Sequence, residues 1–230
     1  MGQNYRHELK FVMSEAEATL LATRLRLTMA QDAHAAQNGG TYFIRSLYFD
    51  DPYESGIGEK VSGIMFRDKY RIRIYNLSDS VIKLERKHKN NSYIKKDSLN
   101  LTRNQCNAII AGEYDFLLHR KEPFAKELYA EFRTRNLKPK VLVDYDREPF
   151  VFPVEDVRIT FDRNIRTSMR PKDIFDRNAI TYPAMSDPTQ CIVEVKFNRY
   201  LPAYIRSLLQ VNAADHTAAS KYVFCRQFDV

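Results

Sequence analysis

Charged and apolar side chains alternate along four segments of this 230-residue chain. The charged positions are Arg6, Glu8 and Lys10; Lys69, Arg71 and Arg73; Lys83, Glu85, Lys87 and Lys89; and Glu194 with Lys196. Because successive side chains of a β-strand point to opposite faces, each segment as a strand would collect its charges on one face. Clustered guanidinium and ammonium groups match phosphate oxygens, and carboxylates bind hard divalent cations such as Mg²⁺ or Mn²⁺. The pattern therefore points to phosphate chemistry.

The alternation alone leaves two placements open for these charged faces. A half-buried antiparallel sheet normally turns its polar face to water. Alternatively, eight strands can close into a barrel whose interior holds one small ligand. An interior lined with Lys, Arg and Glu would have to contain water, ions or a ligand, because unpaired buried charges cost several kcal/mol each. Since basic residues outnumber acidic ones in these segments, such a barrel predicts a triphosphate or polyphosphate ligand with a bound metal.

The elements that would position these residues are mostly strands. Strands are predicted over residues 4–12, 42–50, 67–75, 81–89, 92–99, 140–151, 157–165 and 191–198. Capping boxes, Ser14 with Glu17 and Thr102 with Gln105, predict helices that begin there. Further helices are predicted over 123–136 and from Pro202 onward. Residues 31–41 are predicted as a loop and 56–63 as a flexible connection without a phosphate-cradling GxxxxGK[ST] motif. Short connections favour antiparallel pairing.

Length and composition bound the class of protein. Hydrophobic residues make up 44% of the chain, and 36 Lys and Arg against 29 Asp and Glu give a net charge of +7. This composition excludes a disordered polyanion-binding tail and predicts one folded domain over residues 1–230. Three cysteines without a CxxC pair argue against a disulfide framework or a structural zinc. Without a signal-like or membrane-spanning apolar run, we expect a cytoplasmic protein.

An ordered set of motifs spans almost the whole chain. The motifs are RHELKF (6–11), SLYFD (46–50), YRIRIY (70–75), IKLERKHK (82–89), VDYDREPF (143–150), VRITFD (157–162), IVEVKF (192–197) and SKY (220–222). Each is weak singly, but together and in this order they resemble the VTC (vacuolar transporter chaperone) domain. That family is the polyphosphate-polymerase branch of the triphosphate tunnel metalloenzyme superfamily. The resemblance implies an α+β fold in which an eight-stranded antiparallel β-barrel, with a polar and basic interior, carries peripheral helices.

The resemblance also assigns roles to residues by their position in these motifs. The implied catalytic residues are Arg71, Arg73, Lys87, Arg147 and Arg158. The implied phosphate-binding residues are Lys10, Lys96, Lys196, Ser220 and Lys221, with Tyr145 contacting a nucleobase and Glu194 and Glu8 holding Mn²⁺ or Mg²⁺. Lys95 is the alternative to Lys96. Lys96 lies two residues after the apolar Ile94, so in a strand both would share one face, which conflicts with a charged face. Each basic residue and glutamate could instead be an ordinary ion-paired or solvated group.

The implied reaction is metal-dependent transfer of the γ-phosphoryl group of ATP onto polyphosphate. Such transfer needs positioning and charge neutralisation more than a protein nucleophile, which agrees with the lack of a Ser-His-Asp or Cys-His pattern. Its partners would be ATP, polyphosphate and a separate membrane-protein partner, with a cytoplasmic location peripheral to a membrane complex and no nucleic acid. The alternatives are an inorganic or nucleoside triphosphatase of the same fold and a non-catalytic polyanion-binding module. Arg6 stands where the superfamily's ExExK motif has its first glutamate, which favours the VTC branch over triphosphatases.

Overall fold

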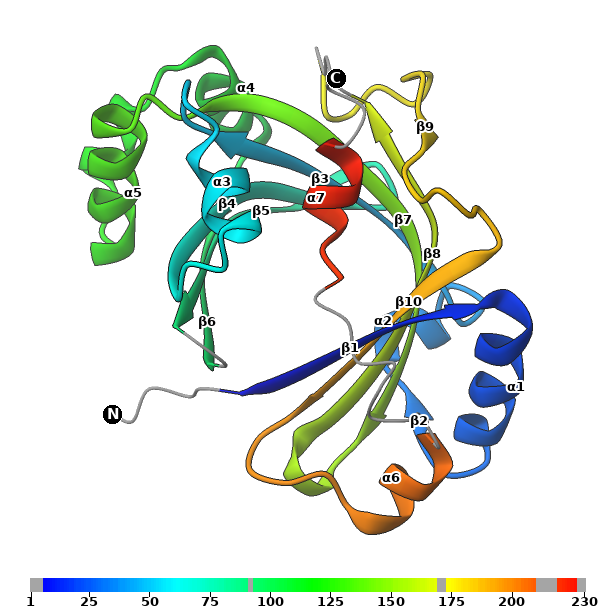
Figure 1. Ribbon diagram of the computed structural model, residues 1–230. Helices are drawn as coiled ribbons and strands as arrows, with labels where there is room; N and C mark the ends of the chain where they lie inside the picture. Colours follow the sequence, from blue (N-terminus) through cyan, green and yellow to red (C-terminus); the bar gives the residue numbers. More distant parts are fainter. Residues whose placement is uncertain (1–5, 91–92, 169–172, 210–218, 227–230) are drawn as a thin grey trace.

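One curved antiparallel sheet with helices around it forms an α+β fold (Figure 1). The computed structural model describes residues 6–90, 93–168, 173–209 and 219–226. The main strands are β1 (His7–Ser14), β3 (Tyr42–Asp50), β4 (Phe66–Tyr75), β5 (Ser78–Asn90), β6 (Tyr93–Leu101), β7 (Lys138–Phe152), β8 (Val157–Ser168) and β10 (Gln190–Phe197). Two short strands, β2 (Ala30–Gln31) and β9 (Tyr182–Pro183), pair with β7 and β8. Each main strand overlaps one of the eight predicted from the sequence.

The strand order leaves the sheet with two edges. The order is β1-β10-β8-β7-β3-β4-β5-β6, and every neighbouring pair is antiparallel. The edge strands β1 and β6 approach each other through a single bridge between Arg6 and Ile94. Beyond this bridge β1 runs away from β6 across the open side of the sheet (Figure 1). Among the described residues, the eight strands therefore form a strongly curved sheet that no continuous ladder of hydrogen bonds closes into the expected barrel.

Helices cover the convex side of the sheet. They are α1 (Glu15–Arg26), α4 (Arg103–Ala111), α5 (Pro123–Thr134) and α6 (Ala203–Leu209), with the 3-10 helices η1 (Asp115–His119) and η2 (Val154–Asp156) nearby. One core joins α4, α5 and η1 to the apolar faces of β3 to β6, and a second joins α1 and α6 to β1, β8 and β10. Both predicted capping boxes are present, at the starts of α1 and α4. The convex face is thus the apolar one.

The concave side holds α2 (Ala33–Ala36) and α7 (Lys221–Arg226). Figure 1 shows α7 within the curve of the sheet. The Tyr222 ring stacks on Tyr48 of β3 at 4.9 Å, and its hydroxyl donates to Asp50 Oδ2 at 2.6 Å. Tyr222 and Cys225 belong to a third apolar cluster with residues of β3, β7 and β8. This cluster fixes α7 against one part of the concave side and leaves the charged part beside it.

Two sequence expectations about connections are wrong. The predicted 31–41 loop contains the end of β2 and the helix α2, whose N-cap Asp32 accepts a hydrogen bond from Ala35 N at 2.9 Å. The predicted flexible segment 56–63 lies largely in α3 (Ser55–Val61). Gly56 fits this helix because it approaches Asp50 closely, and a Cβ there would lie 3.0 Å from Asp50 Oδ2. Within the described residues, no helix is both long and apolar enough to cross a bilayer.

Candidate functional site

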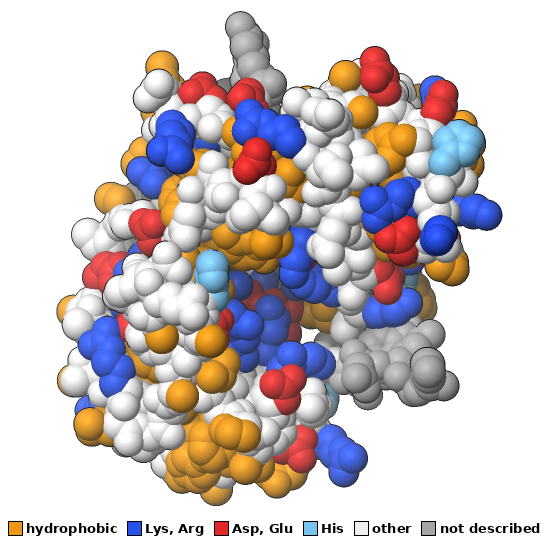
Figure 2. All heavy atoms as spheres, turned by 180° about the vertical axis from the view of Figure 1, so that it is seen from behind, with side chains coloured by type: hydrophobic (Ala, Val, Ile, Leu, Met, Phe, Trp, Pro, Cys, Tyr) orange, Lys and Arg blue, Asp and Glu red, His pale blue; other side chains and the backbone are white. Residues whose placement is uncertain are grey.

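The charged side chains of the sequence motifs share the concave side of the sheet, which we term the inner face. Its members are Glu8 and Lys10 (β1), Lys69, Arg71 and Arg73 (β4), Glu85 and Lys87 (β5), Lys96 (β6), Arg147 (β7), Arg158 and Asp162 (β8), Glu194 and Lys196 (β10) and Lys221 (α7). The alternate residues of the same strands enter the two apolar cores of the convex side. Figure 2 shows a hollow in which Lys and Arg side chains surround acidic ones.

Glu85 lies at the centre of the first charged group. Its carboxylate accepts hydrogen bonds from Arg71 Nε at 2.7 Å and Lys96 Nζ at 2.9 Å, and Arg71 also donates to the Tyr48 hydroxyl at 2.9 Å. Burial by itself would raise the pKa of Glu85, but the charges of Arg71, Arg73 and Lys96 outweigh it and hold that pKa far below its usual value. Glu85 is therefore ionised and keeps the cations of the two flanking strands, β4 and β6, in place.

Glu8 and Glu194 form a second group on the adjacent strands β1 and β10. Lys10 Nζ lies between them, 3.4 Å from Glu8 and 3.6 Å from Glu194. Lys87 reaches Glu8 from β5 at 2.8 Å, and Lys196 pairs with Glu194. Burial and the neighbouring Lys10 charge lower the pKa of Lys87 to about 8, although Glu8 and Glu194 act in the opposite direction. The group thus brings two carboxylates and three ammonium groups together across the gap between β1 and β5.

Asp162 organises a third group. Arg147 donates two hydrogen bonds of 2.7 Å to its carboxylate, and Lys221 of α7 approaches the same carboxylate at 2.5 Å. The Asp162 side chain is fully buried. Both cations also lie over the Tyr145 ring, Arg147 at 5.2 Å and Lys221 at 5.0 Å from its centroid. A single carboxylate therefore joins the C-terminal helix to the sheet.

Arg73 differs from the other guanidinium groups of the inner face. It is only 7% exposed, and it donates to Ser46 Oγ at 3.2 Å and to the Tyr145 hydroxyl at 2.9 Å. Within the part of the chain that the structure describes, no carboxylate lies within ion-pair distance of Arg73. A buried guanidinium that has only neutral hydroxyl partners is costly unless an anion neutralises it. Arg73 therefore marks a place for an anionic ligand.

Two further contacts place the remaining predicted residues. Arg158 donates to Asp32 at 2.5 Å and to the Tyr42 hydroxyl at 3.1 Å, so it lies at the end of the inner face next to α2. Ser220 accepts a hydrogen bond from Lys69 Nζ at 3.0 Å, and Lys69 also lies over the Tyr222 ring. These contacts bring the segment before α7 to the edge of the charged region.

Sequence reasoning brought together the correct face of the sheet but missed several of its partners. Each predicted site residue lies on the inner face or at its edge; the roles assigned to them stay predictions. Lys96, preferred over Lys95, contacts Glu85, whereas Lys95 pairs with Asp97 at 3.3 Å. The missed partners are Asp32, Tyr42, Tyr48 and Asp162. Two of them carried a signal, because Tyr48 lies in the SLYFD motif and Asp162 ends the VRITFD motif on the same strand face as Arg158.

Tyr145 lies deeper than a nucleobase contact would require. Its ring is 2% exposed, its hydroxyl accepts from Arg73, and Lys221 lies over its face. A base could stack on this ring only after Lys221 moved away. In the structure Tyr145 contacts three cations, Arg73, Arg147 and Lys221. Its contact with a nucleobase stays a prediction.

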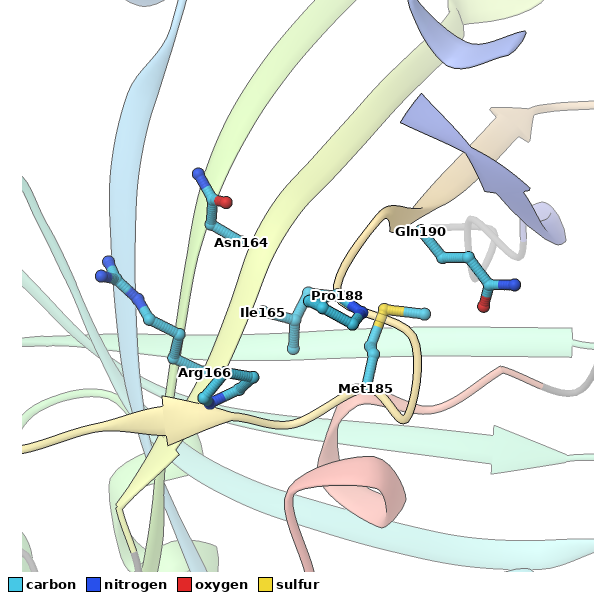
Figure 3. A pocket seen from close by; sticks show the side chains of 7 residues that line it. Asn164, Ile165, Arg166, Met185, Pro188 and Gln190 are labelled. Carbon is cyan, nitrogen blue, oxygen red and sulfur yellow. The ribbon is translucent and has the colours of Figure 1, made fainter. Parts of the chain in front are cut away.

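A separate small cavity of about 120 Å³ lies at the far end of β8 (Figure 3). It is lined by Asn164, Ile165, Arg166, Pro183, Met185, Pro188 and Gln190. None of these residues is a predicted site residue, and none is a carboxylate. The cavity therefore does not extend the charged groups of the inner face.

Comparisons with known proteins agree with this arrangement. A family model described as the VTC domain matches residues 5–228. HpAC1 from Hippeastrum, an adenylyl cyclase candidate described as having a dominant triphosphatase activity, has a similar fold with a TM-score of 0.55 and 14% identity, over 96% of this chain and 94% of that one.

Two prokaryotic structures share the fold at similar levels. An adenylate cyclase candidate from Bacillus halodurans gives a TM-score of 0.51 at 13% identity, over 91% of this chain and 88% of that one. A protein from Pyrococcus horikoshii OT3 gives a TM-score of 0.51 at 11% identity, over 95% and 98%. Among curated proteins, no relative matches the chain. At these identities the structural likeness establishes a common fold.

Proposed function

The chain belongs to the VTC domain family, and on that premise we propose that it is a polyphosphate polymerase that transfers the γ-phosphoryl group of ATP to a polyphosphate chain. The observation that carries the proposal is Arg73, a buried guanidinium without a carboxylate partner, in the middle of a face where cations outnumber carboxylates. A polyanion neutralises such a face better than a singly charged ligand does. ATP and polyphosphate are polyanions of this kind.

Phosphoryl transfer asks the protein mainly to hold phosphates in line and to balance their charge. Arg71, Arg73 and Arg147 converge on the inner face from two strands and can each offer two parallel N–H donors to phosphate oxygens. The lysines on the remaining strands supply further charge toward the attacking and leaving oxygens. Because the nucleophile is itself a phosphate oxygen, the reaction requires no catalytic serine, cysteine or histidine.

Ion pairing holds these cations ready in the absence of substrate. Arg71 and Lys96 share Glu85, and Arg147 and Lys221 share Asp162. Each pair of cations therefore retains a net positive charge that a phosphate can meet without displacing the carboxylate. This arrangement supports binding of several phosphates along the face and keeps the side chains ordered before substrate arrives.

Glu8 and Glu194 fit the proposed Mg²⁺ or Mn²⁺. They lie on neighbouring strands of the same face, and the shared contact with Lys10 places their carboxylates close together. No group of three or more metal-binding side chains occurs among the described residues. Mg²⁺ commonly uses one or two carboxylates and takes its other ligands from substrate phosphates and water. When bound, the metal would neutralise charge on the phosphates, and Lys10 would have to give way to it.

Replacing Glu194 with glutamine is expected to weaken Mn²⁺ binding in the presence of tripolyphosphate by more than about tenfold. Loss of a residue that only supports a metal ligand already lowers metal affinity by about tenfold or more, and loss of the ligand itself should lower it further. Calorimetric titration of Mn²⁺ into the tripolyphosphate complex measures this. Glu85→Gln, which removes a carboxylate of the same face away from the Glu8–Glu194 group, should leave the Mn²⁺ affinity unchanged. Equal Mn²⁺ affinity of wild type and Glu194→Gln would remove Glu194 from the metal site.

Incubation with ATP and Mn²⁺ tests the proposed function directly. A polymerase yields an acid-stable ladder of polyphosphate on a gel together with ADP. A triphosphatase, the second candidate, yields orthophosphate without a ladder; the fold shared with a protein described as having triphosphatase activity favours this candidate. A non-catalytic polyanion-binding module would bind tripolyphosphate and leave ATP intact. The cytoplasmic location and the separate membrane-protein partner belong to the same proposal.

A further inference from the structure

The inner face continues past the charged groups toward the ends of β4 and β5 that lie beside the Arg6–Ile94 bridge. Arg67 of β4 lies directly opposite Lys89 of β5. Arg67 comes two residues before Lys69 on β4, and Lys89 comes two residues after Lys87 on β5. Because side chains alternate along a strand, Arg67 and Lys89 share the inner face with those lysines. The face therefore has basic residues as far as this end of the sheet, which we term the outer mouth.

Cross-strand pairs on the two sides of the β4–β5 ladder have opposite electrostatic character. On the convex side, Asp68 faces His88, and their side chains make a contact of 2.8 Å. On the inner face, Arg67 faces Lys89 and Lys69 faces Lys87, so each pair joins two cations. Like charges directly opposite each other destabilise a sheet. The repulsion is thus confined to the inner face.

The pair at the outer mouth also has no direct ion-pair partner among the described residues. Arg67 donates to the Ile64 carbonyl at 2.8 Å, and within the described residues neither Arg67 nor Lys89 has a carboxylate within ion-pair distance. Lys87, by contrast, pairs with Glu8. Burial and then the charge of Arg67 lower the pKa of Lys89, with Glu8 acting in the opposite direction. Arg67 and Lys89 are thus two half-buried cations that face each other without an ion-pair partner among the described residues, although the charge of Glu59 acts on Arg67 and that of Glu8 acts on Lys89.

Distance along the strand separates this pair from the triphosphate site proposed above. Arg67 and Arg73 lie on the same face of β4 and are six residues apart, a span of about 20 Å in an extended strand. The triphosphate of a single nucleotide is shorter than this span, and the cations between Arg73 and Lys87 already account for it. A linear polyphosphate would extend beyond the triphosphate site and along β4 and β5.

We propose that Arg67 and Lys89 form a subsite at the outer mouth for the distal phosphates of a linear polyphosphate chain, separate from the triphosphate site. The inference rests on the proposed function and adds the path of the polymer to it. The subsite holds the part of the chain that does not react, so it governs how long the product stays bound. ATP, whose phosphates end before this point, does not contact it.

The test compares a long and a short inorganic probe on the full chain. For Arg67→Ala combined with Lys89→Ala, we expect the affinity for long-chain polyphosphate to fall by about tenfold or more, because two charge-assisted hydrogen bonds are lost. The affinity of the same variant for tripolyphosphate should stay within about twofold of the wild-type affinity. In the ATP reaction, the mean product length should fall while the initial rate of ATP use changes little.

The matched control is Lys95→Ala combined with Lys126→Ala. It removes the same charge from side chains of β6 and α5 that do not face the inner side, and it should leave both affinities at the wild-type value. The charge-preserving pair Arg67→Lys with Lys89→Arg should restore long-chain binding. Melting temperatures of all variants confirm that the half-buried replacements fold.

The outcomes separate this inference from the proposed function. If the wild type binds both probes and the Arg67→Ala/Lys89→Ala variant binds them equally well, the subsite is wrong and the polymerase proposal stands. If the variant loses affinity for both probes to the same extent, Arg67 and Lys89 belong to the triphosphate site and the inference is again wrong. If the wild type binds neither probe, the proposed function fails and the subsite fails with it.

Discussion

Replacing Arg73 with methionine is expected to lower the rate of phosphoryl transfer by about a thousandfold or more, as loss of an arginine that stabilises the transferring phosphoryl group does in other phosphoryl-transfer enzymes. Arg73 is buried and has only the hydroxyls of Ser46 and Tyr145 as partners, so its charge is available to the ligand. Methionine keeps the length and much of the volume of the aliphatic stem. Steady-state ATP consumption with a gel of the product measures the loss.

The same substitution should leave the protein folded, because it removes a buried charge that forms no ion pair with a carboxylate of the described chain. A thermal melt with the apo protein checks this, and tripolyphosphate titration should show weaker binding than in the wild type. Arg24→Met is the control, since Arg24 is exposed in the last turn of α1 on the convex side. Full activity of Arg73→Met would show that phosphate does not bind at the centre of the inner face.

Period-two alternation was sufficient to predict which charged residues share a face of the sheet. Glu8 and Lys10 on β1 lie beside Glu194 and Lys196 on β10 in direct register, and the same pattern on β4 and β5 places Arg71 opposite Glu85. Residues two apart on a strand share a face whatever the strands do in three dimensions. The apolar partners of these residues fill the convex cores, which resolves the choice that the sequence left open between inward and outward charges.

Contacts between distant segments could not be predicted in this way. Asp32 contacts Arg158 across 126 residues, and Lys221 reaches Asp162 from a six-residue helix. No local periodicity relates such partners, because their proximity depends on how the sheet curves and where the last helix packs. Closure of the sheet likewise depends on how the sheet curves, so local periodicity could not predict it. The eight predicted strands are all present, but the two short strands β2 and β9 were not predicted. The Arg6–Ile94 bridge between the edges depends on the direction in which β1 leaves β6.

The inner face combines two ways of holding a positive charge. Carboxylates placed between cations, such as Glu85, order the side chains and neutralise part of their charge. Arg73 and the Arg67–Lys89 pair, in contrast, have no ion-pair partner among the described residues. The first arrangement favours a stable apo fold and the second favours ligand affinity. Removing a carboxylate of the first kind should therefore make the fold itself depend on an anionic ligand.

Asp162→Asn is expected to lower the free energy of unfolding by about 3–5 kcal/mol, because it leaves Arg147 and Lys221 as buried cations without their partner. Burial by itself would raise the pKa of the Asp162 carboxyl, but Arg147 and Lys221 outweigh it and lower that pKa to about 2. Because the pKa of Asp162 is lower in the folded than in the unfolded chain, the ionised carboxylate stabilises the fold at pH values above the unfolded pKa. This contribution is lost as the pH falls through about 2, the pKa of Asp162 in the folded protein. Denaturant titrations should therefore show the difference from wild type at pH 7 and its loss in strong acid.

Tripolyphosphate should restore much of this lost stability, since its oxygens can take the place of the missing carboxylate beside Arg147 and Lys221. The control is Asp144→Asn, which breaks the buried pair of Asp144 with Arg45, bonded at 2.9 and 2.8 Å, on the other side of β7. Both variants should lose stability, but the rise in melting temperature with tripolyphosphate should exceed that of the wild type only for Asp162→Asn. An equal rise in all three proteins would mean that phosphates bind elsewhere, and that the Asp162 group only anchors α7 to the sheet.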